Sequence, residues 1–215
     1  MNYKKLIVDS GLRMLRGGYT VETWGNISAR DPETNLVYLT PSGMDYTTIQ
    51  EEDIVVLDLE GNIVEGHRKP SIELDLHLHV YQSRPEVQAV VHTHPIYSTV
   101  FSCCGEDIPM VIDEAAQVLG DVCRTAKYGL PGSKELAENC VEALGKTGNA
   151  CLLRSHGAVC VGKNMDTAFK VCKVLEVTAQ IYQLIRSMGA NYLPIPQQYI
   201  DAMWDFAQNH YGQTP

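Results

Sequence analysis

The stretch AVVHTHPIYS, residues 89–98, sets two histidines one residue apart at the end of an apolar run. Side chains two positions apart in a strand project from the same face, with roots about 6.5 to 7 Å apart at a rise of ~3.3 Å per residue. His92 and His94 can therefore converge on one cation. Neighbouring residues of opposite parity are apolar, so we expect the histidine face to line a cleft, with Pro95 ending the strand at an edge of the sheet. An H-x-H pair alone is equally compatible with two solvated or hydrogen-bonded residues.

A third histidine strengthens the metal hypothesis. His156 follows an apolar stretch in LLRSHGAV and stands beside Gly157, which lets backbone or ligand approach closely. Three neutral imidazoles with one open coordination position are typical of a catalytic zinc site, whereas a structural site is closed by four ligands. The cysteines are not spaced to supply such a fourth ligand. The histidines therefore predict a catalytic metal centre.

The stretch SIELDLHLHVYQS predicts a helix with acidic side chains in its first turn. Ser71 is a favoured N-cap residue, and carboxylates near a helix N-terminus are stabilised by the helix dipole. Glu73 and His77 are spaced i and i+4 and share one face, while Asp75 and His79 form a second such pair. Either pair is compatible with a salt link facing solvent, and this interpretation is favoured for His79.

The elements that position these residues follow from periodicity and turn residues. We expect short strands between Trp24 and Val64, with a hairpin turn around Gly61, then a strand at 87–94, followed by a loop and a mixed region to Leu130. A buried strand pair is expected in ACLLRSHGAVCVG. Helices are expected at 3–16, at 133–144 with Ser133 as its cap, at 166–189 and at 194–210. One α/β domain spanning residues 1–215, with helices around a sheet, is the predicted architecture.

Composition narrows the range of partners. The 215 residues carry a net charge of −9, and the longest basic cluster is HRK at 67–69, so we expect no nucleic-acid partner. No run approaches the roughly 20 apolar residues of a membrane helix, and charges at Asp9 and Arg13 interrupt the N-terminal stretch. We therefore expect no membrane association and a cytoplasmic location. The seven cysteines, an odd number without a C-x-x-C pair, are expected to be reduced and mostly buried.

Five motifs, GNIS, TPSGMDY, KPSIELDLH, VVHTHP and LLRSHGAV, occur in this order along nearly the whole chain. In order and approximate spacing they resemble the class II aldolase and adducin-head superfamily, most closely its L-fuculose-1-phosphate aldolase type. The resemblance implies a single three-layer α/β domain with a central, mostly antiparallel sheet flanked by helices. It also implies a homotetramer with active sites between subunits.

The resemblance assigns roles to the metal-site residues. It implies that His92, His94 and His156 bind Zn²⁺, with Mn²⁺ or Co²⁺ as other candidate metals. It implies that Glu73 is the catalytic acid and base and occupies a metal position in the resting site. A carboxylate displaced from the metal by a substrate oxygen becomes a free base, and the metal acts as a Lewis acid.

The resemblance also implies a phosphate site made of loop and helix-terminal groups. Backbone N–H groups and hydroxyls near a helix N-terminus suit an anion without any lysine or arginine. The positions that match the family pattern are Gly25, Asn26, Thr40, Ser42, Gly43 and Ser71.

Two positions depart from the fuculose-type pattern. Ile72 stands where that type has a second serine, so one phosphate donor is missing. Asp113 stands where a neighbouring subunit's tyrosine assists the aldehyde end of the substrate. The C-terminal tyrosine of the family is matched by Tyr211, which could protonate the leaving alkoxide as a general acid, although a tail aromatic without this role is equally compatible.

The resulting prediction is a class II aldehyde-lyase that reversibly cleaves a ketose 1-phosphate, such as an L-fuculose-1-phosphate-like or 5-deoxypentulose-1-phosphate-like sugar. The products would be dihydroxyacetone phosphate and a small aldehyde. The enzyme alternatives are L-ribulose-5-phosphate 4-epimerase, which carries aspartate where Glu73 stands, and the superfamily's sugar-phosphate decarboxylases and dehydratases. The non-enzyme alternative is an adducin-like interaction module, against which the intact histidines and Glu73 argue.

Overall fold

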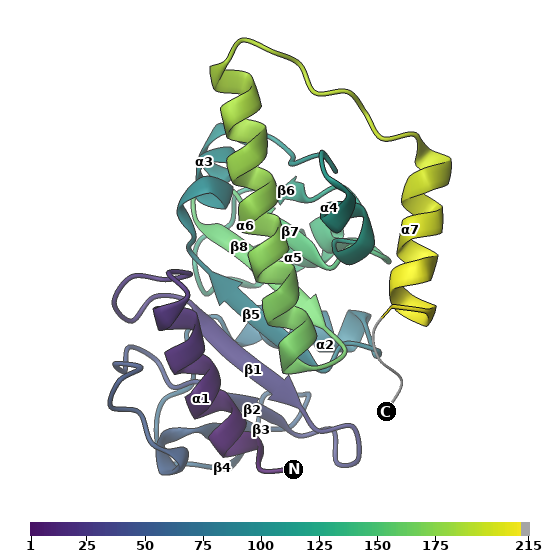
Figure 1. The fold of residues 1–215 in the computed structure, drawn as a ribbon. Helices are drawn as coiled ribbons and strands as arrows, with labels where there is room; N and C mark the ends of the chain where they lie inside the picture. The colour runs from purple at the N-terminus through teal and green to yellow at the C-terminus, as the bar shows by residue number, and fades with distance from the viewer. Residues whose placement is uncertain (212–215) are drawn as a thin grey trace.

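A single eight-stranded sheet forms the centre of the protein in the computed structural model, which describes residues 1–211 (Figure 1). Its strand order is β4-β3-β2-β1-β5-β8-β7-β6, and each neighbouring pair is antiparallel except β6 with β7. The strands are β1 (Asn26–Arg30), β2 (Val37–Leu39), β3 (Val55–Leu57), β4 (Ile63–Glu65), β5 (Ala89–Thr93), β6 (Arg124–Ala126), β7 (Ala150–Leu153) and β8 (Gly157–Gly162).

Helices cover both faces of this sheet and make a three-layer α/β domain, as predicted (Figure 1). One face packs against α1 (Tyr3–Arg16), α3 (Ile96–Cys104), α4 (Asp113–Val118) and α6 (Met165–Ser187). The other face packs against α2 (Leu74–Ser83) and α5 (Lys134–Leu144). A 3-10 turn, η1 (Glu51–Asp53), precedes β3, and α7 (Gln197–Asn209) lies against α4.

Local sequence signals account for most of these elements. Ser133 caps α5 by accepting a hydrogen bond from the N–H of Leu136 at 3.1 Å, which confirms the predicted cap. Asn164 caps α6 in the same way, because its side chain accepts from the N–H of Thr167. Gly61, at φ +89°, forms the turn between β3 and β4 as predicted.

The loop and mixed region expected up to Leu130 contains α3, α4 and β6. The two short helices were not located from periodicity, because packing on α6 and α7 specifies them. Two structural expectations were wrong. Helix α2 begins two residues later than expected: its N-cap is Glu73, and the Ser71 hydroxyl accepts from the N–H of Glu73 at 3.3 Å. Strand β5 lies between β1 and β8 in the interior of the sheet, so the histidine pair lies at the end of a central strand rather than at a sheet edge.

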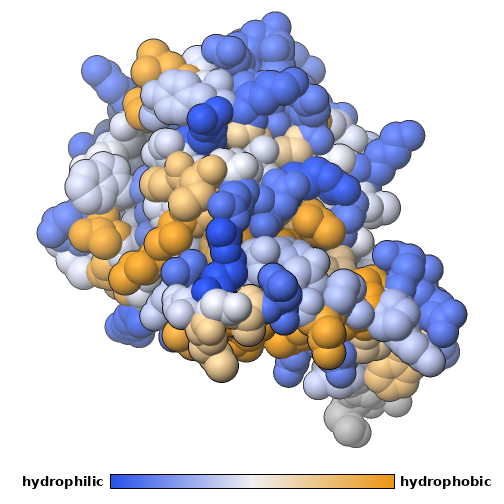
Figure 2. Space-filling model, turned by 90° about the horizontal axis from the view of Figure 1, so that it is seen from above, coloured by the Kyte–Doolittle hydropathy of each residue, from blue (hydrophilic) through white to orange (hydrophobic). Residues whose placement is uncertain are grey.

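Within residues 1–211, no helix is both long and apolar enough to cross a membrane. The face of the molecule seen from above carries hydrophobic side chains in separate patches between hydrophilic ones (Figure 2). Five cysteines are buried, whereas Cys103 and Cys104 are exposed.

Candidate active site

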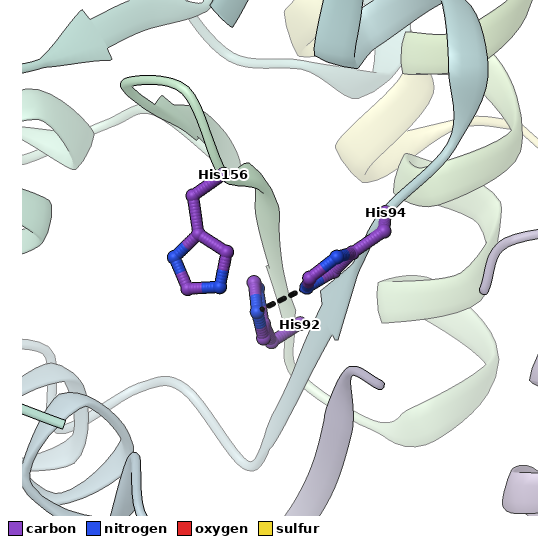
Figure 3. A group of neighbouring side chains, drawn as sticks. All are labelled: His92, His94 and His156. Carbon is purple, nitrogen blue, oxygen red and sulfur yellow. Dashed lines mark hydrogen bonds between the residues drawn. The ribbon is translucent and has the colours of Figure 1, made fainter. Parts of the chain in front are cut away.

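Three imidazole rings converge at the carboxyl end of β5 (Figure 3). His92 is the penultimate residue of β5, His94 follows the strand, and His156 lies in the tight turn between β7 and β8. Their ring centroids are 4.7 to 4.9 Å apart, and one nitrogen from each ring lies within 4.8 Å of the others. The predicted convergence of these histidines is therefore present in the fold.

Each histidine is held by neighbouring main chain. The Nδ1 of His92 lies 3.0 Å from the carbonyl oxygen of Ala158, so Nδ1 carries the hydrogen and donates it. The N–H of His94 donates to the carbonyl of Tyr19 at 2.7 Å. Gly157 makes this packing feasible, because a Cβ there would lie 2.3 Å from the carbonyl oxygen of Thr93 and 3.1 Å from the His94 ring. The glycine beside His156 thus serves close backbone approach, as predicted.

The carboxylate of Glu73 completes the cluster from the N-terminus of α2. Its Oε2 lies 3.2 Å from Nε2 of His92, and its Oε1 lies 3.5 Å from Nε2 of His156. The side chain is buried, and Asn26 donates a hydrogen bond to Oε2 at 2.8 Å. Oε1 is buried and has no hydrogen-bond partner within residues 1–211. A buried carboxylate oxygen without a partner is costly unless a ligand satisfies it.

The donor set fits a divalent cation. Because Nδ1 of His92 is protonated, its Nε2 directs a lone pair toward Nε2 of His94, 2.9 Å away, and toward Glu73. Converging lone pairs and a carboxylate repel one another unless a cation lies among them. Ligand atoms around tetrahedral zinc are about 3.3 Å apart when each bond is ~2.0–2.1 Å, and the separations of 2.9, 3.2 and 3.5 Å scatter around this value.

The protonation states also suit a metal. Burial lowers the pKa of His94 to about 3 and the pKa of His156 to about 4, so both rings are neutral near pH 7 and keep a lone pair for coordination. Burial alone would raise the pKa of Glu73. Positive charge among the imidazoles, at His92 first, and the hydrogen bond from Asn26 lower it, and together they outweigh burial; a cation held by neutral rings acts on the carboxylate in the same direction. The pKa of this carboxyl group therefore lies below its ordinary value, and the group is ionised at neutral pH.

A cleft of about 570 Å³ opens beside the histidines and contains five of the six residues expected to bind phosphate. Within the part of the chain that the structure describes, no lysine or arginine lines it. Gly25 is required at its place, since its φ is +74° and a Cβ would lie 2.6 Å from the carbonyl oxygen of His92. The expected residues that line the cleft are Gly25, Asn26, Ser42, Gly43 and Ser71.

The sixth expected residue, Thr40, lies behind the cleft wall. Its side chain is buried, and its hydroxyl accepts a hydrogen bond from the N–H of Ile27 at 3.2 Å. Its carbonyl oxygen accepts from the N–H of Ser71 at 3.2 Å, so Thr40 positions Ser71 instead of facing the cleft. Ile72, which replaces the second serine of the family pattern, lines the cleft and is exposed.

Two other expected site residues lie outside this cleft in the single chain. Asp113 is exposed at the start of α4, beside α7. Tyr211 is exposed. Its ring makes an edge-to-face contact with Phe206, and the Lys170 ammonium lies 5.2 Å from the centroid of the Tyr211 ring. Their catalytic roles stay predictions, since the resemblance places such groups in a site shared between subunits.

Sequence reasoning missed a buried polar network behind Glu73. Asn26 was expected to face phosphate, yet its amide bonds Glu73 on one side and His77 on the other. The signal that could have revealed the network is the spacing of polar residues along α2, which alternate with apolar residues of the core. The expected Asp75–His79 salt link is absent within residues 1–211: Nδ1 of His79 lies 2.8 Å from the backbone carbonyl of Asp75.

Three histidines and a buried glutamate beside a cleft that no lysine or arginine of residues 1–211 lines, within an α/β domain, form the donor set of a metal-dependent enzyme. The chain belongs to the class II aldolase and adducin N-terminal domain family, whose sequence model matches residues 5–183. This membership confirms the predicted fold class and family.

Relatives of known name extend over most of the chain. It is 38% identical over 209 residues to a 5-deoxy-D-ribulose 1-phosphate aldolase of Bacillus thuringiensis, covering 96% of this chain and 95% of that protein. It is also 38% identical over 170 residues to an L-fuculose phosphate aldolase of Methanococcus maripaludis, covering 79% of this chain and 90% of that protein. A solved L-fuculose 1-phosphate aldolase superimposes with a TM-score of 0.92 at 36% identity, covering 96% of both chains.

Proposed function

We propose that this protein is a zinc-dependent class II aldolase that reversibly cleaves a ketose 1-phosphate to dihydroxyacetone phosphate and a small aldehyde. The observation that carries the proposal is the convergence of His92, His94 and His156 beside the buried carboxylate of Glu73, whose Oε1 has no hydrogen-bond partner within residues 1–211. Relatives named as aldolases of 5-deoxy-D-ribulose 1-phosphate and of L-fuculose phosphate support it.

The metal would be held by His92, His94 and His156, with Glu73 as a further ligand in the resting site. When bound, it supplies a Lewis acid that stabilises negative charge on the substrate oxygens beside the reacting carbon. Zinc is proposed because neutral imidazoles suit it, while Mn²⁺ and Co²⁺ are the other candidates.

Glu73 is proposed to move the proton on carbon. In condensation, its carboxylate takes a proton from the hydroxymethyl carbon of dihydroxyacetone phosphate, and the electron pair left behind attacks the aldehyde carbon. The aldehyde oxygen then receives a proton, for which Tyr211 of a neighbouring copy is proposed as the acid. In cleavage the same steps run backwards, and the protonated Glu73 returns its proton to carbon.

The substrate phosphate is proposed to bind between the loops of Gly25, Ser42 and Gly43 and the N-terminus of α2 at Ser71. Backbone N–H groups and hydroxyls there offer neutral donors, and the helix dipole favours an anion. Thr40 contributes by holding the Ser71 backbone, and Asn26 by holding Glu73. The exposed apolar side chain of Ile72 contributes no hydroxyl to this site.

The whole chain, residues 1–215, is proposed to form one domain that assembles as a homotetramer, with Asp113 and Tyr211 reaching the site of a neighbouring copy. Both residues are exposed and lie outside the cleft of their own chain, which supports a role between subunits. A cytoplasmic location stays a prediction.

The main alternative is L-ribulose-5-phosphate 4-epimerase, since an epimerase of that name from Salmonella paratyphi A is 32% identical over 202 residues. The glutamate at position 73 favours the aldolase. The adducin-like interaction module is disfavoured by the intact donor set.

The decisive experiment is a screen of ketose 1-phosphates, with release of dihydroxyacetone phosphate detected by coupled reduction. We expect cleavage of at least one of these sugars, loss of cleavage after treatment with a chelator, and recovery with Zn²⁺. Epimerisation of L-ribulose 5-phosphate without release of dihydroxyacetone phosphate would favour the alternative. Purified protein without bound metal and without either activity would favour the interaction module.

A further inference from the structure

A chain of five buried polar side chains runs from Glu73 into the core between α2 and β1. Asn26 Nδ2 lies 2.8 Å from Glu73 Oε2, and Asn26 Oδ1 lies 2.5 Å from His77 Nε2. Ser28 Oγ lies 2.6 Å from His77 Nδ1 and 2.7 Å from the Tyr81 hydroxyl. Glu73, His77 and Tyr81 recur every fourth residue on one helix face, while Asn26 and Ser28 alternate on one strand face. The two elements therefore interleave their polar groups.

The charge of Glu73 sets the direction of every hydrogen bond among these five polar side chains. An ionised carboxylate only accepts, so Asn26 must turn its NH₂ toward Glu73 and its oxygen toward His77. His77 must then donate through Nε2–H, which leaves Nδ1 as an acceptor for the Ser28 hydroxyl. The oxygen of Ser28 in turn accepts from the hydroxyl of Tyr81. At each link, the group nearer the core donates its hydrogen to the group nearer the carboxylate.

Burial makes this arrangement rigid. Ser28 and His77 have no exposed surface, Tyr81 is 1% exposed and Asn26 is 6% exposed. Burial lowers the pKa of His77 to about 3 and raises the pKa of Tyr81 above its ordinary value, so both stay neutral near pH 7. Asn26, Ser28, His77 and Tyr81 find hydrogen-bond partners within this polar network, so breaking one link leaves a neighbour unsatisfied.

We propose that His77 is a positioning residue, whose Nε2–H orients the Asn26 amide so that it holds Oε2 of Glu73 and leaves Oε1 free to transfer the proton on carbon. The inference rests on the proposed function of Glu73. His77 touches neither the substrate nor the cation in this arrangement. It acts through Asn26, which the family resemblance places among the phosphate ligands.

Two substitutions at one position separate the donor from the bulk of the ring. His77→Gln places an amide N–H near the position of Nε2 and keeps a donor for Asn26. His77→Asn is too short and keeps only a group near the position of Nδ1. The matched control is His79→Asn on the same helix, where the ring bonds the carbonyl of Asp75 outside the polar chain.

The readout is exchange of deuterium from D₂O into dihydroxyacetone phosphate without aldehyde, which isolates the proton transfer assigned to Glu73. For the zinc-loaded protein, we expect His77→Asn to slow exchange about 10- to 100-fold, the range for residues that orient a site group. Metal content and the KM for dihydroxyacetone phosphate stay unchanged, and His77→Gln recovers most of the rate. Equal exchange by His77→Asn and the wild type, or equal losses in both variants, overturns the inference.

A second measurement decides the matter even where His77→Asn fails to fold. In wild-type protein with ¹⁵N-labelled histidine, side-chain ¹⁵N shifts identify which ring nitrogen of His77 carries the hydrogen. We expect Nε2–H with an unprotonated Nδ1, and the Nδ1–H form overturns the inference. If the wild type folds and binds metal but exchanges no deuterium, the proposed function of Glu73 fails, whereas the tautomer still tests the orientation of Asn26.

Discussion

Oε2 of Glu73 lies 3.2 Å from Nε2 of His92, both almost fully buried, although 19 positions separate them (92 − 73) and they belong to different elements. The contact joins the N-terminus of α2 to the end of β5. It places a carboxylate where it can either share a cation with the imidazole or act as a base on a molecule in the cleft.

His92→Ala is expected to abolish stoichiometric zinc binding, because the other two imidazoles and Glu73 then lack the buried ligand at the centre of the cluster. Cleavage activity is expected to fall by more than ~100-fold, beyond the range for a residue outside the ligand set. Metal content measured on the purified protein checks this. Retention of one zinc per chain by the variant would contradict the ligand assignment.

Glu73→Gln is expected to retain metal, since three imidazoles remain, but to lose about 10²- to 10⁴-fold in turnover, because an amide cannot accept the proton from carbon. Steady-state cleavage and metal content should be measured on the same preparation. An unchanged cleavage rate would show that Glu73 is not the base.

Gly157→Ala is expected to destabilise the protein by about 1–3 kcal/mol, because a methyl group there would overlap the Thr93 carbonyl. Zinc affinity should fall as well, since the His94 ring lies beside that methyl group. Denaturant unfolding and metal titration measure both effects. Gly189→Ala is the control: its Cβ would meet no atom within 4 Å, so only the cost of a left-handed backbone, about 1 kcal/mol, applies. Equal losses in the two variants would show that the overlap is unimportant.

The free energy of unfolding is expected to fall as the pH drops from about 6.5 toward 3. In that window the unfolded chain protonates His77, whereas the folded chain, in which its pKa is about 3, does not. The unfolded state therefore binds more protons, and stability rises with pH. His77→Gln removes this group, so its pH slope between 4 and 6 should be shallower by about 1.4 kcal/mol per pH unit. Identical slopes in denaturant unfolding would show that His77 protonates freely in the fold.

Mixing two inactive variants is expected to restore activity if the sites lie between subunits. In assemblies of Glu73→Gln with Tyr211→Phe, about one quarter of the sites combine both native residues under random assortment. Cleavage should rise to that fraction after subunits are exchanged. Light scattering should give the size of a tetramer, and a fully active monomer would contradict shared sites.

The sequence was most informative where local physics decides. The H-x-H pair had to project from one face because strand side chains alternate. Ser133 predicted the start of α5 because its hydroxyl accepts a hydrogen bond from a free N–H of the first turn. The motifs supplied the family that the comparison confirmed. By contrast, α3 and α4 escaped prediction, since packing against α6 and α7 stabilises them.

The sequence by itself determined which residue types could form a metal site, and that His92 and His94 would share a face. Only the tertiary structure decided that His156 and Glu73 join them, that Thr40 lies behind the cleft, and that Asn26 turns to Glu73. The reason is physical: strand and helix periodicity act over a few residues. The distances that decide coordination and hydrogen bonding are created when α2, β1, β5 and the β7–β8 turn pack against one another.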